Sequence, residues 1–174
     1  MALRDLLVHV DHTGPGALRL QLAVDLASRH RARLSVLYVA ERTLAQLKWL
    51  KAAELGLAPS GDVERYEHGI EDQITAHENR LQEMTARARE EHGIEAIWCP
   101  VSGSAATLVP RLARYADLTI VGQNQAPGND LPDGYSFAET MLFLTGRPVI
   151  LVPPVILVPM SVATPTLGRQ VAIA

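Results

Sequence analysis

Five short apolar runs, separated by segments with helical spacing, are the feature that most restricts the fold of this chain. Each run is continuously apolar or β-branched and does not alternate with polar residues. Strands have this pattern when both faces of a parallel sheet are covered. The repeated order of strand and helix predicts a doubly wound α/β domain with right-handed crossovers. The expected strands are residues 6–10, 34–40, 94–101, 118–122 and 148–152.

The segments between these runs have apolar residues three and four apart, as amphipathic helices do. Residues 62–91 predict a long surface helix with a solvated charged side, and residues 44–61 predict a short helix that can lie over the sheet as a flap. In the other two segments the expected buried lines are Leu18, Leu22 and Leu26, with Ala23 and Ala27 beside them, and Leu108, Leu112 and Ala116, with Val109 and Ala113 beside them.

Size and composition exclude several classes of protein. The 174 residues suit one domain, and 48% hydrophobic with 20% charged residues argue against disorder. A formal charge of -3, with no stretch dominated by Lys or Arg, predicts no nucleic-acid and no acidic-membrane partner. Cys99 is the only cysteine, which excludes an internal disulfide and suits a reducing, cytoplasmic setting. We expect it to be a small buried hydrophobic residue.

Neither end of the sequence predicts a membrane or export segment. The first apolar stretch is short and is interrupted by Asp5, so we expect no signal peptide. Residues 148–165 have the length of a membrane span, but their prolines would remove backbone donors from a helix. We therefore predict no transmembrane segment.

Three loops are expected to meet beyond the carboxyl ends of the strands, where the strand order reverses and sheets of this kind bind ligands. The first loop contains Asp11, and the second follows Val39. The third follows the fourth strand and reads "GQNQAPGNDLPDGYS", from Gly122 to Ser136. Its glycines and its position before a helical segment are typical of a phosphate-binding loop.

At these loops the sequence resembles the universal stress protein (UspA-like) family. The resemblance rests on "HVDHT", "LYVAE", "SFAETML" and "GRPVILV", which occur in this order, and it covers residues 3–153. It implies a Rossmann-like, adenine nucleotide alpha hydrolase-like domain over residues 1–153. That domain has a five-stranded parallel sheet of order 3-2-1-4-5 with helices on both faces. The resemblance also implies that Val39 borders adenine and that Asp11 lies beside the site.

The nucleotide motif of that family, G-x2-G-x9-G-[S/T], can be placed on this sequence. With its first glycine on Gly122, the second falls on Gln125, the third on Tyr135 and the hydroxyl residue on Ser136. Two larger side chains thus replace glycines that would let backbone N–H groups approach phosphate. We therefore expect no cofactor, weak or absent binding of ATP or ADP, and a domain that works in stress response by binding and regulation without turnover.

Two alternatives stay open at this loop. Gly128 and Gly134 lie off register, but with the first glycine they can rebuild the anion nest. The domain would then be an ATP-binding switch with slow hydrolysis, in which Asp11 faces the ribose or a metal on the phosphates. Ser136 predicts the N-cap of the next helix, with Glu139 completing a capping box, and contact with an anion is an additional possibility.

Other candidate sites have weaker signals. His9, Asp11 and His12 are residue types that bind zinc, but alternation along a strand points the two histidines to opposite faces. A packed His9 and a loop His12 are therefore expected. His9 and His12 also resemble the H-x-G-H signature of nucleotidyltransferases, but the glycine is absent. Asp11 and His12 are the only candidates for a small-molecule enzyme of a related fold. Ser104, with Pro110 in the first turns, predicts a helix cap or an anion-binding helix terminus.

The fifth strand and the residues after it predict assembly. An apolar edge strand needs cover, and the resemblance implies a homodimer through this strand. Residues 154–174 resemble a linker and the first strand of a second domain, so we expect the first domain of a tandem-type member, truncated at the start of the second. The expected dimer residues are Val149, Ile150, Leu151 and Val152.

Overall fold

A computed structural model describes residues 3–11, 15–39, 51–52, 54–56, 60–123 and 136–153. Strands and helices alternate along them, which confirms the predicted order. Among the helices of these residues, none has an apolar stretch of the length that a bilayer requires. The elements are β1 (Asp5–Val10), α1 (Pro15–His30), β2 (Arg33–Val39), α3 (Ser60–His92), β3 (Ala96–Val101), α4 (Ala105–Ala113), β4 (Leu118–Gly122), α5 (Phe137–Leu144) and β5 (Val149–Val152).

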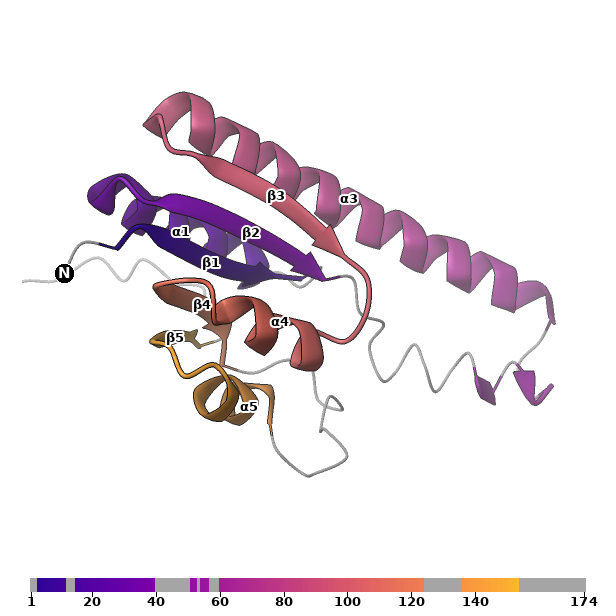
Figure 1. Cartoon of the computed structure of the whole chain (residues 1–174). Helices are drawn as coiled ribbons and strands as arrows, with labels where there is room; N and C mark the ends of the chain where they lie inside the picture. The colour runs from indigo at the N-terminus through magenta and orange to yellow at the C-terminus, as the bar shows by residue number, and fades with distance from the viewer. Residues whose placement is uncertain are drawn as a thin grey trace, which may run out of the picture.

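The five strands form one parallel sheet in the order β3-β2-β1-β4-β5 (Figure 1). β1 lies at its centre and pairs with β2 from Asp5 opposite Arg33 to Val10 opposite Tyr38. On its other side β1 pairs with β4, where Val8 lies opposite Ile120. β3 and β5 are the outer strands of the described sheet. This order is the one that the resemblance implied, and the doubly wound fold is confirmed.

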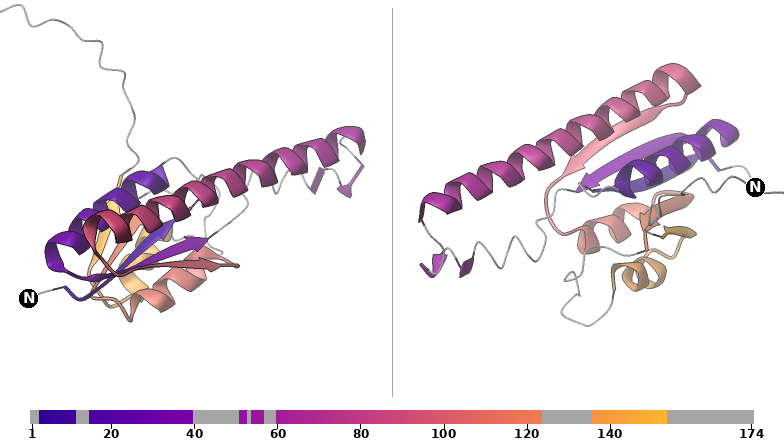
Figure 2. Two further views of the ribbon diagram at one scale, coloured as in Figure 1. Left: turned by 90° about the horizontal axis from the view of Figure 1, so that it is seen from above. Right: turned by 180° about the vertical axis from the view of Figure 1, so that it is seen from behind.

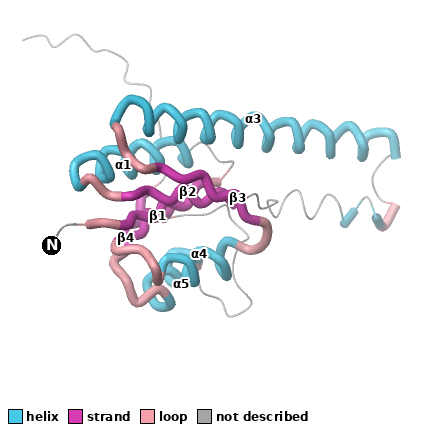
Figure 3. The backbone as a smooth tube through the Cα atoms, turned by 45° about the horizontal axis from the view of Figure 1, so that its top comes forward, coloured by secondary structure: helices cyan, strands magenta, loops and turns pink. Residues whose placement is uncertain are grey.

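Helices cover both faces of the sheet, α1 and α3 on one side and α4 and α5 on the other (Figures 2 and 3). Alternate strand residues therefore enter two separate cores. Val8 and Val36 pack under α1 and α3. Leu7 and Leu37 pack under α4 and α5. Because both faces are buried, most residues along the central strands are apolar, with His9 and Thr119 as buried polar exceptions, which explains the nearly continuous apolar runs.

The buried faces of two helices differ from the predicted lines. In α1, Leu20 and Ala27 are fully buried, whereas Leu18 is 49% exposed. In α4, Val109 is fully buried and Leu112 is 39% exposed. Several overlapping lines fit a spacing of three and four residues, and contact with the sheet selects one of them. The helices were predicted correctly, and the smaller residues expected beside each line are buried, but Leu18 and Leu112 are not.

Helix α3 extends well beyond the carboxyl end of β3 (Figure 1). In its second half Leu81 and Ala88 are buried. Ile70 and Ile74, nearer its start, are only half-buried. The predicted apolar stripe is therefore confirmed where the helix covers the sheet. The side chains of residues 60–67 lie outside the described part of the chain.

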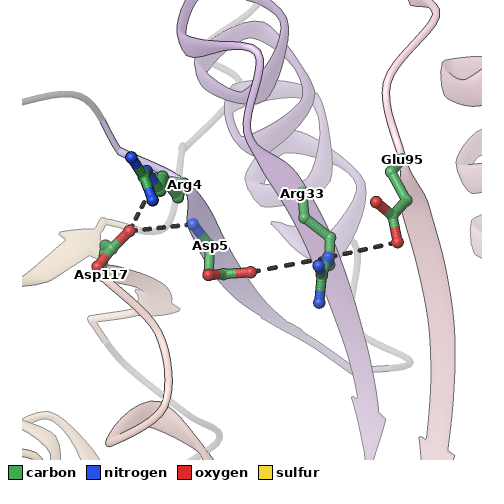
Figure 4. A network of polar contacts seen from close by, with 5 residues as sticks. All are labelled: Arg4, Asp5, Arg33, Glu95 and Asp117. Atoms are coloured by element: carbon green, nitrogen blue, oxygen red, sulfur yellow. Dashed lines mark hydrogen bonds and ion pairs between the residues drawn. The ribbon is translucent and has the colours of Figure 1, made fainter.

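Polar contacts tie the strands together at the amino end of the sheet, opposite the candidate site (Figure 4). The Asp117 carboxylate accepts hydrogen bonds from the backbone N–H groups of Arg4 at 2.7 Å and Asp5 at 3.1 Å. These bonds hold the pKa of Asp117 below its ordinary value. The Arg33 guanidinium lies 3.7 Å from Asp5 and 3.3 Å from Glu95, and all three side chains are about half exposed or more. Exposed pairs add little stability, so this cluster mainly aligns the starts of the strands.

Two predicted features fall outside the described residues. Most of the expected flap, residues 44–61, belongs to this group, as do residues 154–174 with the expected start of a second domain. The flap, the boundary between residues 153 and 154, and the tandem arrangement stay predictions from the sequence.

Candidate functional site

The strand order reverses between β1 and β4, at the centre of the sheet. From β1 the chain winds outward to β2 and β3, and it then continues on the other side with β4 and β5. The crevice beyond the carboxyl ends of β1 and β4 is therefore the place where such a sheet binds ligands. Asp11 follows β1 directly, and Gly122 is the last residue of β4. The structure thus brings two of the predicted site residues to this crevice.

The loop that carries most of the other candidates lies outside the described residues, as does His12. The proposal that larger side chains fill the place of phosphate therefore stays a prediction. The loop residues concerned are Gln125, Gly128, Gly134 and Tyr135.

A buried ion pair joins Asp11 to Arg19 of α1. The Arg19 Nη2 donates to Asp11 Oδ2 at 2.8 Å, and the side chains are 3% and 13% exposed. The Arg19 Nε donates to the backbone carbonyl of His9 at 3.0 Å. The Arg19 guanidinium therefore binds the end of β1 through both the Asp11 side chain and the His9 backbone. Sequence reasoning missed Arg19, although a charged residue within the apolar pattern of α1, eight residues after a strand-end carboxylate, was a usable signal.

Two glycines make room for this ion pair. A Cβ on Gly122 would lie 2.6 Å from Arg19 Nη1. A Cβ on Gly16 would lie 2.8 Å from the Asp11 carbonyl oxygen and 3.6 Å from its Oδ1. Distances below 3 Å are too short for such atoms, so a side chain at position 122 would displace the Arg19 guanidinium, and one at position 16 would displace the backbone of Asp11. Close packing on Arg19 is thus sufficient to explain Gly122, which was predicted from the phosphate motif.

His9 lies inside the protein, beneath the start of α5. It is fully buried, as predicted, and its ring centre is 5.4 Å from that of Phe137. Burial lowers the pKa of His9 to about 4; the Asp11 carboxylate opposes this shift and Arg19 adds to it. Neutral His9 therefore does not act as an exposed base. Among the described residues, no group of His, Cys, Asp or Glu side chains is arranged to hold a metal ion.

The end of β2 is apolar and buried. Val39 is 1% exposed and packs in the core beneath α4 and α5. Its predicted contact with adenine is not tested by the described residues. Tyr38 packs on the opposite face, where its ring stacks on Trp98 at 5.3 Å. Burial, with the nearby charges of Glu78 and Asp11, raises the pKa of Tyr38 to about 12, so its hydroxyl stays protonated.

Ser136 begins α5 as its N-cap. Its hydroxyl accepts a hydrogen bond from the Glu139 N–H at 3.2 Å, and its own N–H donates to Glu139 Oε2 at 2.7 Å. These bonds lower the pKa of Glu139 and form the predicted capping box. The cap fully accounts for both residues. Contact of Ser136 with an anion stays a prediction.

Two weaker candidates differ from expectation. Ser104 occupies the N-cap position of α4, but its side chain makes no capping hydrogen bond. Its carbonyl instead accepts from the N–H groups of Thr107 and Leu108, as an ordinary first turn requires. Pro110 lies in the second turn of α4, as predicted. Cys99 is only half-buried because β3 is an outer strand, and burial raises the pKa of its thiol.

The fold resembles solved structures of universal stress proteins. UspA from Lactobacillus plantarum is 18% identical, with a TM-score of 0.57 over 86% of this chain and 97% of that one. A universal stress protein in complex with cAMP is 17% identical, with a TM-score of 0.54 over 88% and 98%. A protein of the family from Burkholderia pseudomallei is 21% identical, with a TM-score of 0.51 over 86% and 96%. No family model matches the sequence. No curated protein matches it. At these identities the likeness shows the fold alone.

The close approach of Gly122 to Arg19 predicts an energetic coupling between them. Gly122→Ala should lower the free energy of unfolding by about 1–3 kcal/mol in the intact chain, because the methyl group meets a fixed guanidinium. In an Arg19→Ala background, Gly122→Ala should lower the free energy of unfolding by at least about 0.5 kcal/mol less than it does in the intact chain. Urea unfolding measures this free energy in both backgrounds. Gly69→Ala, in an open helical position, is the control and should not destabilise. Equal costs in both backgrounds would contradict the packing role.

Burial of neutral His9 predicts a loss of stability in mild acid. Because its pKa is lowered in the folded state, only the unfolded chain takes up this proton between pH 6.5 and about 4. The intact chain should lose on the order of 3 kcal/mol from this group over that range. Unfolding at several pH values should show that His9→Phe removes this slope, while His30→Gln at the exposed end of α1 retains it. An unchanged slope in His9→Phe would refute the assignment.

Proposed function

We propose that this chain is a universal stress protein domain that acts in stress response by binding and regulation, with weak or absent ATP binding. The observation that carries the proposal is the arrangement at the switch point. Asp11 follows β1, Gly122 ends β4 and Ser136 caps α5, which agrees with the order of the motif that the sequence suggested. The likeness to solved universal stress proteins in fold and in chain coverage supports it.

Absence of turnover is part of the proposal. Arg19 already pairs with the strand-end carboxylate, and the imidazole of His9 is buried and neutral. Among the described histidines, His9 is the only one at the carboxyl ends of β1 and β4. A general base at this crevice is therefore hard to supply from the described residues. A reducing, cytoplasmic setting agrees with the single cysteine of the sequence.

An ATP-binding switch with slow hydrolysis is the alternative. The observation that favours it is the solved universal stress protein in complex with cAMP, which shares this fold. The difference between the two candidates depends on nucleotide affinity, and it can be measured directly.

Calorimetry with Mg-ATP tests the proposed function. We expect no binding to the intact chain at nucleotide concentrations up to about 1 mM, which corresponds to an affinity of only about 4 kcal/mol. A Gln125→Gly/Tyr135→Gly variant restores the glycines of the motif and should bind at least about tenfold more tightly, if the loop contributes. A dissociation constant in the low micromolar range for the intact chain would overturn the proposal and favour the switch.

We also propose a homodimer through β5. Thr119 N–H donates to the Pro148 carbonyl, and Gln123 N–H donates to the Val152 carbonyl. In a parallel ladder the intervening odd-numbered residues then direct their backbone groups away from β4. Leu151 therefore offers its N–H and C=O to a further strand. The helix α5 contacts β5, and its Phe143 is 74% exposed, so the same part of the fold carries exposed apolar surface.

Sedimentation of two variants tests the dimer. Leu151→Pro removes an outward N–H without removing a bond to β4, so it should yield monomers. Leu151→Ala loses a similar amount of packing but keeps the N–H, so it is the matched control and should remain dimeric. A monomeric intact chain at about 100 µM, or an unchanged dimer in Leu151→Pro, would refute this interface.

A further inference from the structure

The Asp11 carboxylate is directed into the protein. Its Oδ2 accepts a hydrogen bond from Arg19 at 2.8 Å, and its Oδ1 lies 3.6 Å from where a Cβ of Gly16 would stand. Both oxygens thus lie against the first turns of α1, and only 13% of the side chain is exposed. A carboxylate at the carboxyl end of a strand is the type of acceptor that binds ribose hydroxyls in doubly wound folds, although there it usually follows the second strand and here it follows the first. Here α1 already satisfies this acceptor.

The Arg19 guanidinium is fixed in place. Besides its bond to Asp11, it donates from Nε to the His9 carbonyl at 3.0 Å. Its Nη1 fills the space beneath Gly122, where even a methyl group would collide with it. Movement of Arg19 toward solvent would break both bonds and leave an empty space between β1 and β4. The pair is therefore a permanent part of the switch point.

Stability alone gives a weak reason for this charge. Buried ion pairs are often no more stabilising than well-packed apolar residues of similar volume. Position 19 is followed by buried apolar residues of α1, Leu20 and Ala23, so an apolar side chain would suit the pattern. The main effect of the ion pair is on the carboxyl end of β1, where the Asp11 carboxylate is already bound by Arg19.

We infer that Arg19 is a specificity-determining residue that closes the switch-point site to nucleosides. Arg19 binds the Asp11 carboxylate, which is the acceptor that a ribose diol requires. It also occupies the space beneath Gly122, the first glycine of the loop after β4. This inference rests on the proposed function and gives weak nucleotide binding a cause in the described residues, independent of the loop. The site then discriminates against the nucleoside itself, whatever phosphates it carries.

Titration with adenosine tests the inference, because this ligand has no phosphate to contact the loop. Arg19→Ala and Arg19→Gln should each bind adenosine at least about tenfold more tightly than the intact chain, as expected for hydroxyls that donate to a charged acceptor. The gain should disappear in Asp11→Asn/Arg19→Ala. Arg87→Ala, which removes an exposed arginine of α3, is the matched control and should leave the affinity unchanged.

The outcomes separate the inference from the proposed function. Unchanged adenosine affinity in the Arg19 variants, with circular dichroism showing that they fold, would overturn the inference alone. Failure of both variants to fold would also overturn it, because the pair would then serve stability. Micromolar binding of Mg-ATP by the intact chain would overturn the proposed function and the inference together, because the Asp11–Arg19 pair would then not close the site to a nucleoside.

Discussion

The contact on which the switch point depends is the buried ion pair between Asp11 and Arg19. A charge that is taken out of water requires a partner with suitable geometry. Arg19 meets this requirement with the Asp11 carboxylate and the His9 carbonyl, and so it fixes α1 against the end of β1. Gly122 follows from it, since it leaves room for the guanidinium, and Gly16 leaves room for the backbone carbonyl of Asp11.

This arrangement uses for internal packing the same positions that a nucleotide site would use for a ligand. Asp11 accepts from Arg19, Gly122 lies against the guanidinium, and the Ser136 hydroxyl caps its own helix. Each position therefore agrees with a nucleotide-binding pattern in sequence, and each has a structural partner within the chain. A shared fold does not imply a shared ligand, because function depends on the groups that remain available at the site.

The strands and the capping box could be predicted from the sequence because both depend on local chemistry, whereas the order of the strands came from the family resemblance. A continuous apolar run indicates a strand covered on both faces, and a Ser followed three residues later by Glu indicates a helix start. Which side of a helix is buried depends on contacts made by residues distant in sequence, so Leu18 and Leu112 were wrongly assigned to the core. Arg19 could have been suspected as a charge within the apolar pattern of α1, but its contacts with the end of β1 and with Gly122 of β4 depend on residues distant in sequence.

The account depends most on Arg19 being buried and held between β1 and β4. Nitrogen-15 NMR of the arginine side chains measures this directly, through the exchange of the Arg19 Nε–H with water. A hydrogen bond to the His9 carbonyl and 3% side-chain exposure predict an Nε–H signal that is well separated and slow to exchange at neutral pH. Exchange as fast as that of Arg87, whose side chain is 68% exposed, would contradict the account.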